Sequence, residues 1–177
     1  MAFALDATVG GSSANSFVSL AEAQTYMDAR LNSSAWSAAS PTNQSIALVE
    51  ATRELSARRW IGEAVSSSQA LAWPRAFARN PDAAWGTGAL YFDTTVIPQR
   101  VKDATCELAF QFLNAGTTDI ASLDATLNTR VKTVDVITTE YFEPNQRRQG
   151  LARFPRVMNY IRQLLDSVPG SARVIRG

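Results

Sequence analysis

The chain has 177 residues, of which 46% are hydrophobic, and a net charge of +1, so one domain with a sizeable buried core is expected. No hydrophobic run approaches the roughly 18 residues that a membrane span requires, and no signal peptide is expected because the N-terminus lacks a basic segment. Histidine is absent, which removes the usual general base, and Cys106 is the lone cysteine, which excludes an intrachain disulfide and is typical of a reducing compartment.

Residues 1–18 are small and polar and include two glycines, which predicts an extended N-terminal arm. The first helix is expected to begin at Ser19, because Ser19 and Glu22 form the S-x-x-E pattern of a capping box. Apolar side chains recur at helical spacing up to Leu31, so this helix is expected to end near Asn32.

The second helix is expected to have Pro41 in its first position, where a missing N–H costs little. It is predicted to run to about Ile61 and to end at Gly62. Two opposite sides of this helix are apolar, with Leu55 on one and Trp60 on the other. A helix with two apolar sides packs between neighbours, so we expect a central position and a core role for both residues.

Residues 62–97 show no sustained periodicity, and the turn-forming strings AWPR, ARNPD and WGTG predict one long loop. A loop of this length in a compact domain usually has a function or a partner. Near its centre, the string QALAWPR places Trp73, Pro74 and Arg75 together as a loop anchor.

Two interpretations of Trp73 remain open. Arginines interleaved with aromatic residues, here Arg75, Phe77 and Arg79 after Trp73, are typical of single-stranded nucleic-acid binding. The apolar string ALAWP instead favours a structural anchor, which pins the loop onto the helical core near Trp60. We favour the anchor, and we then expect Arg75 to stay at the surface and pair with an acid or a neighbouring subunit.

The third long helix is predicted to begin after Pro98 and to stop at Gly116. Its apolar residues cover more than half of the helix circumference. This pattern predicts the best-buried helix of the chain, with Leu108 and Phe112 in the core.

The β-branched, alternating string VKTVDVITTEYF predicts a β-hairpin over residues 131–142. The last helix is predicted over Pro155–Val168, and residues 169–177 are expected to form a tail without an apolar face. The predicted fold is mainly α: a small bundle of four to five helices in one domain, residues 19–168, with a β-hairpin and extended N- and C-terminal arms.

The sequence contains few residues or motifs typical of catalysis, and we expect no enzyme activity, no metal site and no cofactor. The sequence has neither a phosphate-binding G-x-x-x-x-G-K-[ST] loop nor a G-x-S-x-G turn, and a Ser-His-Asp triad is impossible without histidine. Asp103 and Glu107 lie one helical turn apart, where two carboxylates can share a cation or a proton, but such pairs more often lie in a solvated or intersubunit strip. Cys106 has apolar neighbours and is expected to be an inert core thiol.

Positive charge is concentrated at the C-terminal end, where residues 145–177 carry seven arginines and one aspartate. The planar donors of arginine suit phosphate and carboxylate groups. Two interpretations remain open: a solvated surface with salt bridges, and a surface that contacts an acidic partner or a nucleic-acid backbone. The candidates for such contacts are Arg147, Arg148, Arg153, Arg156, Arg173 and Arg176.

Several strings occur together in a recognisable order: NSFVSLAEA, ALVEATRELSARRW, QALAWPR, VIPQRVKDATCELAFQFL and VKTVDVITTEYF. This order resembles a family of tailed-bacteriophage proteins labelled DnaT-like single-stranded DNA-binding, whose members are similar to head–tail connector (adaptor, or head-completion) proteins. The resemblance covers residues 14–168. The chain departs from the family pattern in the stretch ARNPDAAWGTGALYF and in the tail SARVIRG.

The resemblance implies a structural virion protein that forms a ring with copies of itself, typically a dodecamer, between the portal protein and the next tail or neck component. Such a ring extends the channel for packaged double-stranded DNA, contacts that DNA non-specifically and involves no membrane. It implies a place at the virion neck after synthesis in the host cytoplasm, with the candidate arginines facing DNA or acidic portal groups. The alternative is a single-stranded DNA-binding protein of phage replication, which exposes its aromatic residues and binds DNA with steep salt dependence.

Overall fold

The computed structural model describes residues 4–84, 90–118, 120, 131–134, 137–140 and 150–166, and for the two strands between 131 and 140 it describes the backbone alone. Five α-helices lie in these residues: α1 (Leu20–Asp28), α2 (Ser34–Ser37), α3 (Pro41–Ser56), α4 (Gln99–Ala115) and α6 (Pro155–Ile161). A 3-10 helix, η2 (Gly150–Arg153), precedes α6. The strands form two antiparallel pairs, β1 (Glu63–Ala64) with β2 (Arg75–Ala76) and β3 (Val131–Val134) with β4 (Ile137–Glu140). This architecture confirms the predicted mainly helical class with a hairpin.

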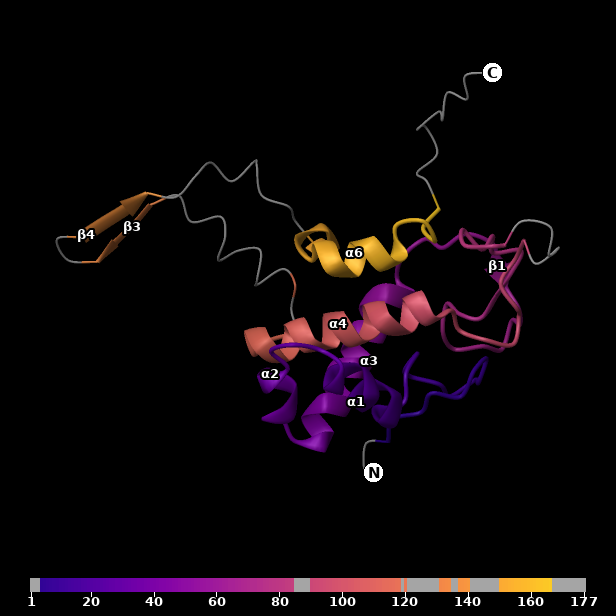
Figure 1. Ribbon diagram of the computed structural model, residues 1–177, viewed down its shortest axis with the longest axis horizontal. Helices are drawn as coiled ribbons and strands as arrows, with labels where there is room; N and C mark the ends of the chain where they lie inside the picture. Colours follow the sequence, from indigo (N-terminus) through magenta and orange to yellow (C-terminus); the bar gives the residue numbers. More distant parts are fainter. Residues whose placement is uncertain are drawn as a thin grey trace, which may run out of the picture.

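Helix α4 lies at the centre of the fold. Figure 1 shows it between α6 on one side and α1, α2 and α3 on the other. Its apolar stripe is buried from Val101 to Phe112, and Gly116 ends the helix in the left-handed conformation, with a φ of 69°. The residues predicted for the core are all buried, and they are Leu55, Trp60, Leu108 and Phe112.

The first helix begins as predicted but ends early. Ser19 and Glu22 form the capping box, since each side chain accepts from the backbone N–H of the other residue. The helix ends at Asp28 rather than near Asn32, and Leu31 is 88% exposed. Asn32 has a φ of 58°, a left-handed conformation in which the helix cannot continue.

The second long helix also ends earlier than predicted, at Ser56 instead of Ile61. Trp60 lies in an extended segment that pairs with Leu165 after α6. Its indole N–H donates to the backbone oxygen of Leu55 (3.0 Å), which also accepts from the Arg58 N–H (3.1 Å) at the end of the helix. Trp60 is therefore buried in the core as predicted, but it follows α3 in the chain and does not lie on a second apolar side of this helix.

The last residues of the N-terminal arm pack against the helices. Ala14 and residues 16–18 are buried, and the Phe17 N–H donates to Oγ1 of Thr52 on α3 (3.2 Å). Because Phe17 and Val18 have large apolar side chains, the chain gains more from burying them than from leaving the arm in water. The tail, residues 169–177, lies outside the described residues.

In its described segments, the 62–97 loop contains no helix before α4, and short antiparallel backbone pairings hold these segments together. Strand β1 pairs with β2 at the base of the loop, and Arg79 forms an isolated bridge with Tyr91. Gly62 has a φ of 75°, and a Cβ at this position would come within 2.4 Å of the Ala76 carbonyl oxygen. Only glycine fits this crossing of two backbone segments.

The predicted 131–142 hairpin is confirmed for its two strands. The register pairs Val131 with Glu140 and Val134 with Ile137. Figure 1 shows the hairpin apart from the packed helices. In the part of the chain that the structure describes, no helix has both the length and the apolar character to cross a bilayer.

Candidate functional site

Trp73 lies inside the helical core. Its side chain is buried, and its ring makes edge-to-face contacts with Trp60 (ring centroids 5.6 Å apart) and Phe92 (5.9 Å). Such contacts stabilise a fold beyond the area they bury. Pro74, joined to Trp73 by a cis peptide bond, is buried as well. A nucleic-acid base cannot stack on a ring that the core covers, so the position of Trp73 is that expected of a structural anchor.

Arg75 binds backbone carbonyls rather than an acid, which corrects the prediction of a surface ion pair. Its guanidinium donates to the backbone oxygens of Ile61 (2.8 Å), Gly62 (2.6 Å) and Ala72 (3.2 Å). Burial lowers the pKa of Arg75, and the nearby Glu63 carboxylate opposes this shift. The planar fork of donors thus satisfies three carbonyls at the base of the loop.

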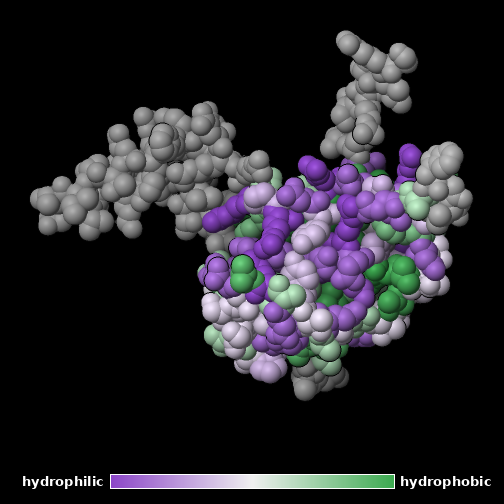
Figure 2. All heavy atoms as spheres, in the orientation of Figure 1, coloured by the Kyte–Doolittle hydropathy of each residue, from purple (hydrophilic) through white to green (hydrophobic). Residues whose placement is uncertain are grey.

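An exposed aromatic pair lies on the outer side of the same loop. Phe77 is 69% exposed and Tyr91 is 54% exposed, and their ring centroids lie 6.3 Å apart at an interplanar angle of 88°. Arg79 is exposed as well, and its backbone pairs with that of Tyr91. We call these three residues the aromatic platform. Figure 2 shows hydrophobic side chains gathered on the side of the molecule where Figure 1 labels β1.

The backbone pairing of two loop segments sets the orientation of the platform. The Phe92 N–H donates to the Ala78 carbonyl (2.9 Å), and the Asn80 N–H donates to the Leu90 carbonyl (2.9 Å). In extended chains, neighbouring side chains point to opposite sides. Ala78 is buried and Phe92 packs against the core, while Phe77, Arg79 and Tyr91 beside them are exposed.

Phe77 has an unusual backbone conformation for a bulky residue, with a φ of 56°. Left-handed backbone at such a residue costs roughly 1–3 kcal/mol and is concentrated at functional sites. The rest of the loop holds Phe77 in this conformation although its ring buries little area. The conformation therefore points to a role for the ring outside the fold.

The sequence predicts part of this platform. It groups Phe77 and Arg79 with Trp73 and Arg75, but the structure turns the first two outward and the last two inward. Tyr91 was missed. The string ALYFD holds the signal for it, because a strand that buries Phe92 must expose its neighbour.

A buried carboxylate forms a second polar cluster. Glu107 on α4 is fully buried, which corrects the prediction of a solvated or intersubunit strip. Arg30 donates from Nε to Oε1 (3.1 Å) and from Nη2 to Oε2 (3.3 Å), and the Tyr26 hydroxyl donates to Oε1 (2.8 Å). Burial, with hydrogen bonds to Tyr160 and Glu107, raises the pKa of Tyr26, so its hydroxyl stays protonated. Nothing in the helical spacing distinguishes Glu107 from an exposed residue.

The candidate arginines are only partly described. Arg156 lies in α6 with its side chain 61% exposed, and its Nη1 is 3.2 Å from Oε1 of Glu107. The guanidinium of Arg153 lies 6.0 Å from the ring centroid of Phe154. Arg147, Arg148, Arg173 and Arg176 lie outside the described residues.

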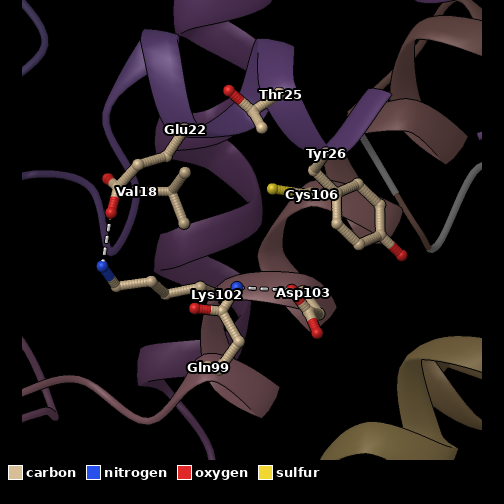
Figure 3. Close-up of a pocket in the computed structure, with 8 residues that line it drawn as sticks. All are labelled: Val18, Glu22, Thr25, Tyr26, Gln99, Lys102, Asp103 and Cys106. Carbon is tan, nitrogen blue, oxygen red and sulfur yellow. Dashed lines mark hydrogen bonds and ion pairs between the residues drawn. The ribbon is translucent and has the colours of Figure 1, made fainter. Parts of the chain in front are cut away.

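A cavity of about 290 Å³ lies between α1 and α4. Figure 3 shows Glu22 and Lys102 at one side of it, joined by an ion pair of 2.5 Å, with Cys106 pointing into it. Burial, with the carboxylates of Asp103 and Glu107, raises the pKa of Cys106 to about 12, so the thiol is unreactive at neutral pH. Among the residues that the structure describes, no cluster of His, Cys, Asp or Glu could hold a metal ion.

The comparisons with known proteins assign the family. The family model described as "Putative DnaT-like ssDNA binding protein" matches residues 1–177, the whole chain. The chain therefore belongs to this family. The description mentions single-stranded DNA and says nothing of a portal, a connector or a virion. No curated protein and no solved structure matches the chain.

Proposed function

We propose that this protein binds single-stranded DNA through the aromatic platform. The observation that carries the proposal is the exposed pair of Phe77 and Tyr91 with the cation of Arg79 beside it. Proteins that bind single strands without sequence preference combine aromatic rings that stack on bases with cations that follow the backbone. The family description names the same ligand. The proposal assigns no catalytic step to the chain.

The geometry of the platform favours a single strand over a duplex. In a duplex, both faces of each internal base are already stacked on neighbouring bases. An aromatic side chain can stack on a base only where that base is free to leave the stack, as in a single strand. The rings of Phe77 and Tyr91 are nearly perpendicular. Two bases stacked on them would have to turn sharply relative to one another, which a flexible single strand allows and a duplex opposes.

Alanine substitutions at the two rings test the proposal. Each of Phe77→Ala and Tyr91→Ala should weaken binding of a fluorescent oligothymidylate by about 5-fold to 150-fold, since stacking contributes about 1–3 kcal/mol per base. Fluorescence anisotropy gives the dissociation constants. Leu31→Ala serves as the control, because Leu31 is also exposed but follows α1 and is not part of the 62–97 loop. Equal affinities for all three variants and the wild type would refute the proposal.

A second candidate function is the connector ring that the sequence resemblance implies. The observation that favours it is the β3–β4 hairpin, which lies apart from the packed helices (Figure 1). A hairpin in this position has strand edges that can pair with a second copy of the chain. The mass of the protein alone and after mixing with a portal protein tests this candidate. A defined ring on the portal would support it, and two unmixed species would exclude it.

A further inference from the structure

The cluster around Glu107 contains two arginines with different environments. Arg30 is almost buried, with 12% of its side chain exposed, and it binds both carboxylate oxygens. The Arg30 guanidinium also lies 3.8 Å from the ring centroid of Phe110. Arg30 therefore supplies the counter-charge that a buried carboxylate requires.

Arg156 reaches the same carboxylate from the surface. It contacts one oxygen of Glu107, at 3.2 Å, and that oxygen already accepts from Arg30 and Tyr26. One negative charge thus faces two guanidinium groups. If the exposed Arg156 moves away, Arg30 still pairs with Glu107, so the buried carboxylate does not become an unpaired charge.

Among the described residues at the C-terminal end, arginines outnumber acids. Residues 150–166 carry three arginines and one acid, Asp166, which pairs with Arg59. A guanidinium that is exposed and shares its carboxylate partner with a second arginine is suited to bind a phosphate oxyanion.

We infer that Arg156 is a phosphate-binding residue that contacts the backbone of bound DNA, while Arg30 has a purely structural role. The inference rests on the proposed function, because it gives the bound strand a second contact, on α6. Glu107 orients the guanidinium, and Arg30 keeps the carboxylate compensated when Arg156 turns toward the phosphate.

The salt dependence of binding distinguishes these roles. For a single strand, the slope of log K against log salt changes by about 0.7 for each phosphate contact. We expect Arg156→Gln to weaken oligothymidylate binding severalfold, to reduce the slope by about 0.7 and to leave the melting temperature close to that of the wild type. Arg156→Lys should restore most of the slope, because the charge is kept.

Two controls separate a phosphate contact from other effects. Arg53→Gln removes an arginine of similar exposure, which pairs with Glu50 on the surface of α3, and should leave the slope unchanged. Arg30→Gln should lower the melting temperature markedly, since the exposed Arg156 is then the one cation that the described residues place beside the buried Glu107. If Arg156→Gln retained the wild-type slope, or lowered the melting temperature as much as Arg30→Gln, the inference would be wrong.

A direct probe keeps the inference testable if the proposed function fails. If the wild-type protein does not bind the oligonucleotide, the proposed function is wrong. Inorganic phosphate can then be titrated while the side-chain NMR signals of the arginines are followed. A shift of the Arg156 signal that Arg53 does not share would support the phosphate site, and no shift would overturn it.

Discussion

At the scale of single residues, burial separates the aromatic side chains of the 62–97 loop into two groups. Trp73 and Phe92 pack in the core, where edge-to-face contacts join them to each other. Phe77 and Tyr91 remain in solvent and make their own edge-to-face contact. The first group holds the loop in place, and the second is available to a ligand.

Replacing the anchor should destabilise the protein. Trp73→Ala removes a large buried side chain, and the cavity it leaves should cost about 3–5 kcal/mol of the free energy of unfolding. Within the described residues the Trp73 indole N–H meets no hydrogen-bond acceptor, so Trp73→Phe should cost less than the alanine variant. Urea denaturation followed by circular dichroism measures both. Unchanged stability of Trp73→Ala, combined with lost DNA binding, would instead make Trp73 a stacking residue.

At the scale of secondary structure, Glu22 joins two helices. Its carboxylate accepts from the N–H and the hydroxyl of Ser19 at the start of α1, and from the ammonium of Lys102 on α4. Burial acts to raise the pKa of Glu22, but the hydrogen bonds from Lys102 and Ser19 outweigh it and lower the pKa from 4.5 to about 2. One side chain thus caps α1 and fixes it against the central helix.

The lowered pKa of Glu22 predicts a pH dependence of stability. Since the folded protein favours the ionised form, this contribution is fully present above pH 4.5 and is lost as the pH falls toward 2. Glu22→Gln lacks the charge, so it should lose less stability than the wild type over this range. Urea midpoints measured at about pH 6 and about pH 3 give the comparison. Identical losses in the two proteins would show that Glu22 does not carry this dependence.

At the scale of the whole molecule, local patterns predict the helices, but they do not predict which polar residues are buried. The capping box at Ser19, the glycine after α4 and the β-branched hairpin are local signals, and the structure contains each of them. Glu107 has no local signal, because its burial depends on Arg30 and Arg156, which are distant in the sequence. Contacts between distant segments also explain why the N-terminal arm folds back.

The sequence predicts only part of the aromatic platform, because the platform also depends on a contact between distant segments. Phe77 and Arg79 stand out as an aromatic residue and a cation in a loop, but their partner Tyr91 comes from the other side of the loop. The pairing of the two segments decides which side chains face outward. Composition alone therefore groups Trp73 and Arg75, which the structure turns inward, with Phe77 and Arg79, which it leaves exposed.

The most direct test of DNA binding compares a single strand with a duplex of the same sequence and length. Fluorescence anisotropy of the wild-type protein, with labelled oligonucleotides of about 20 nucleotides, gives both dissociation constants across a series of salt concentrations. Binding through the aromatic platform predicts tighter binding of the single strand and weaker binding as salt increases. Equal or tighter binding of the duplex, or no binding of either, would contradict it and favour the connector ring.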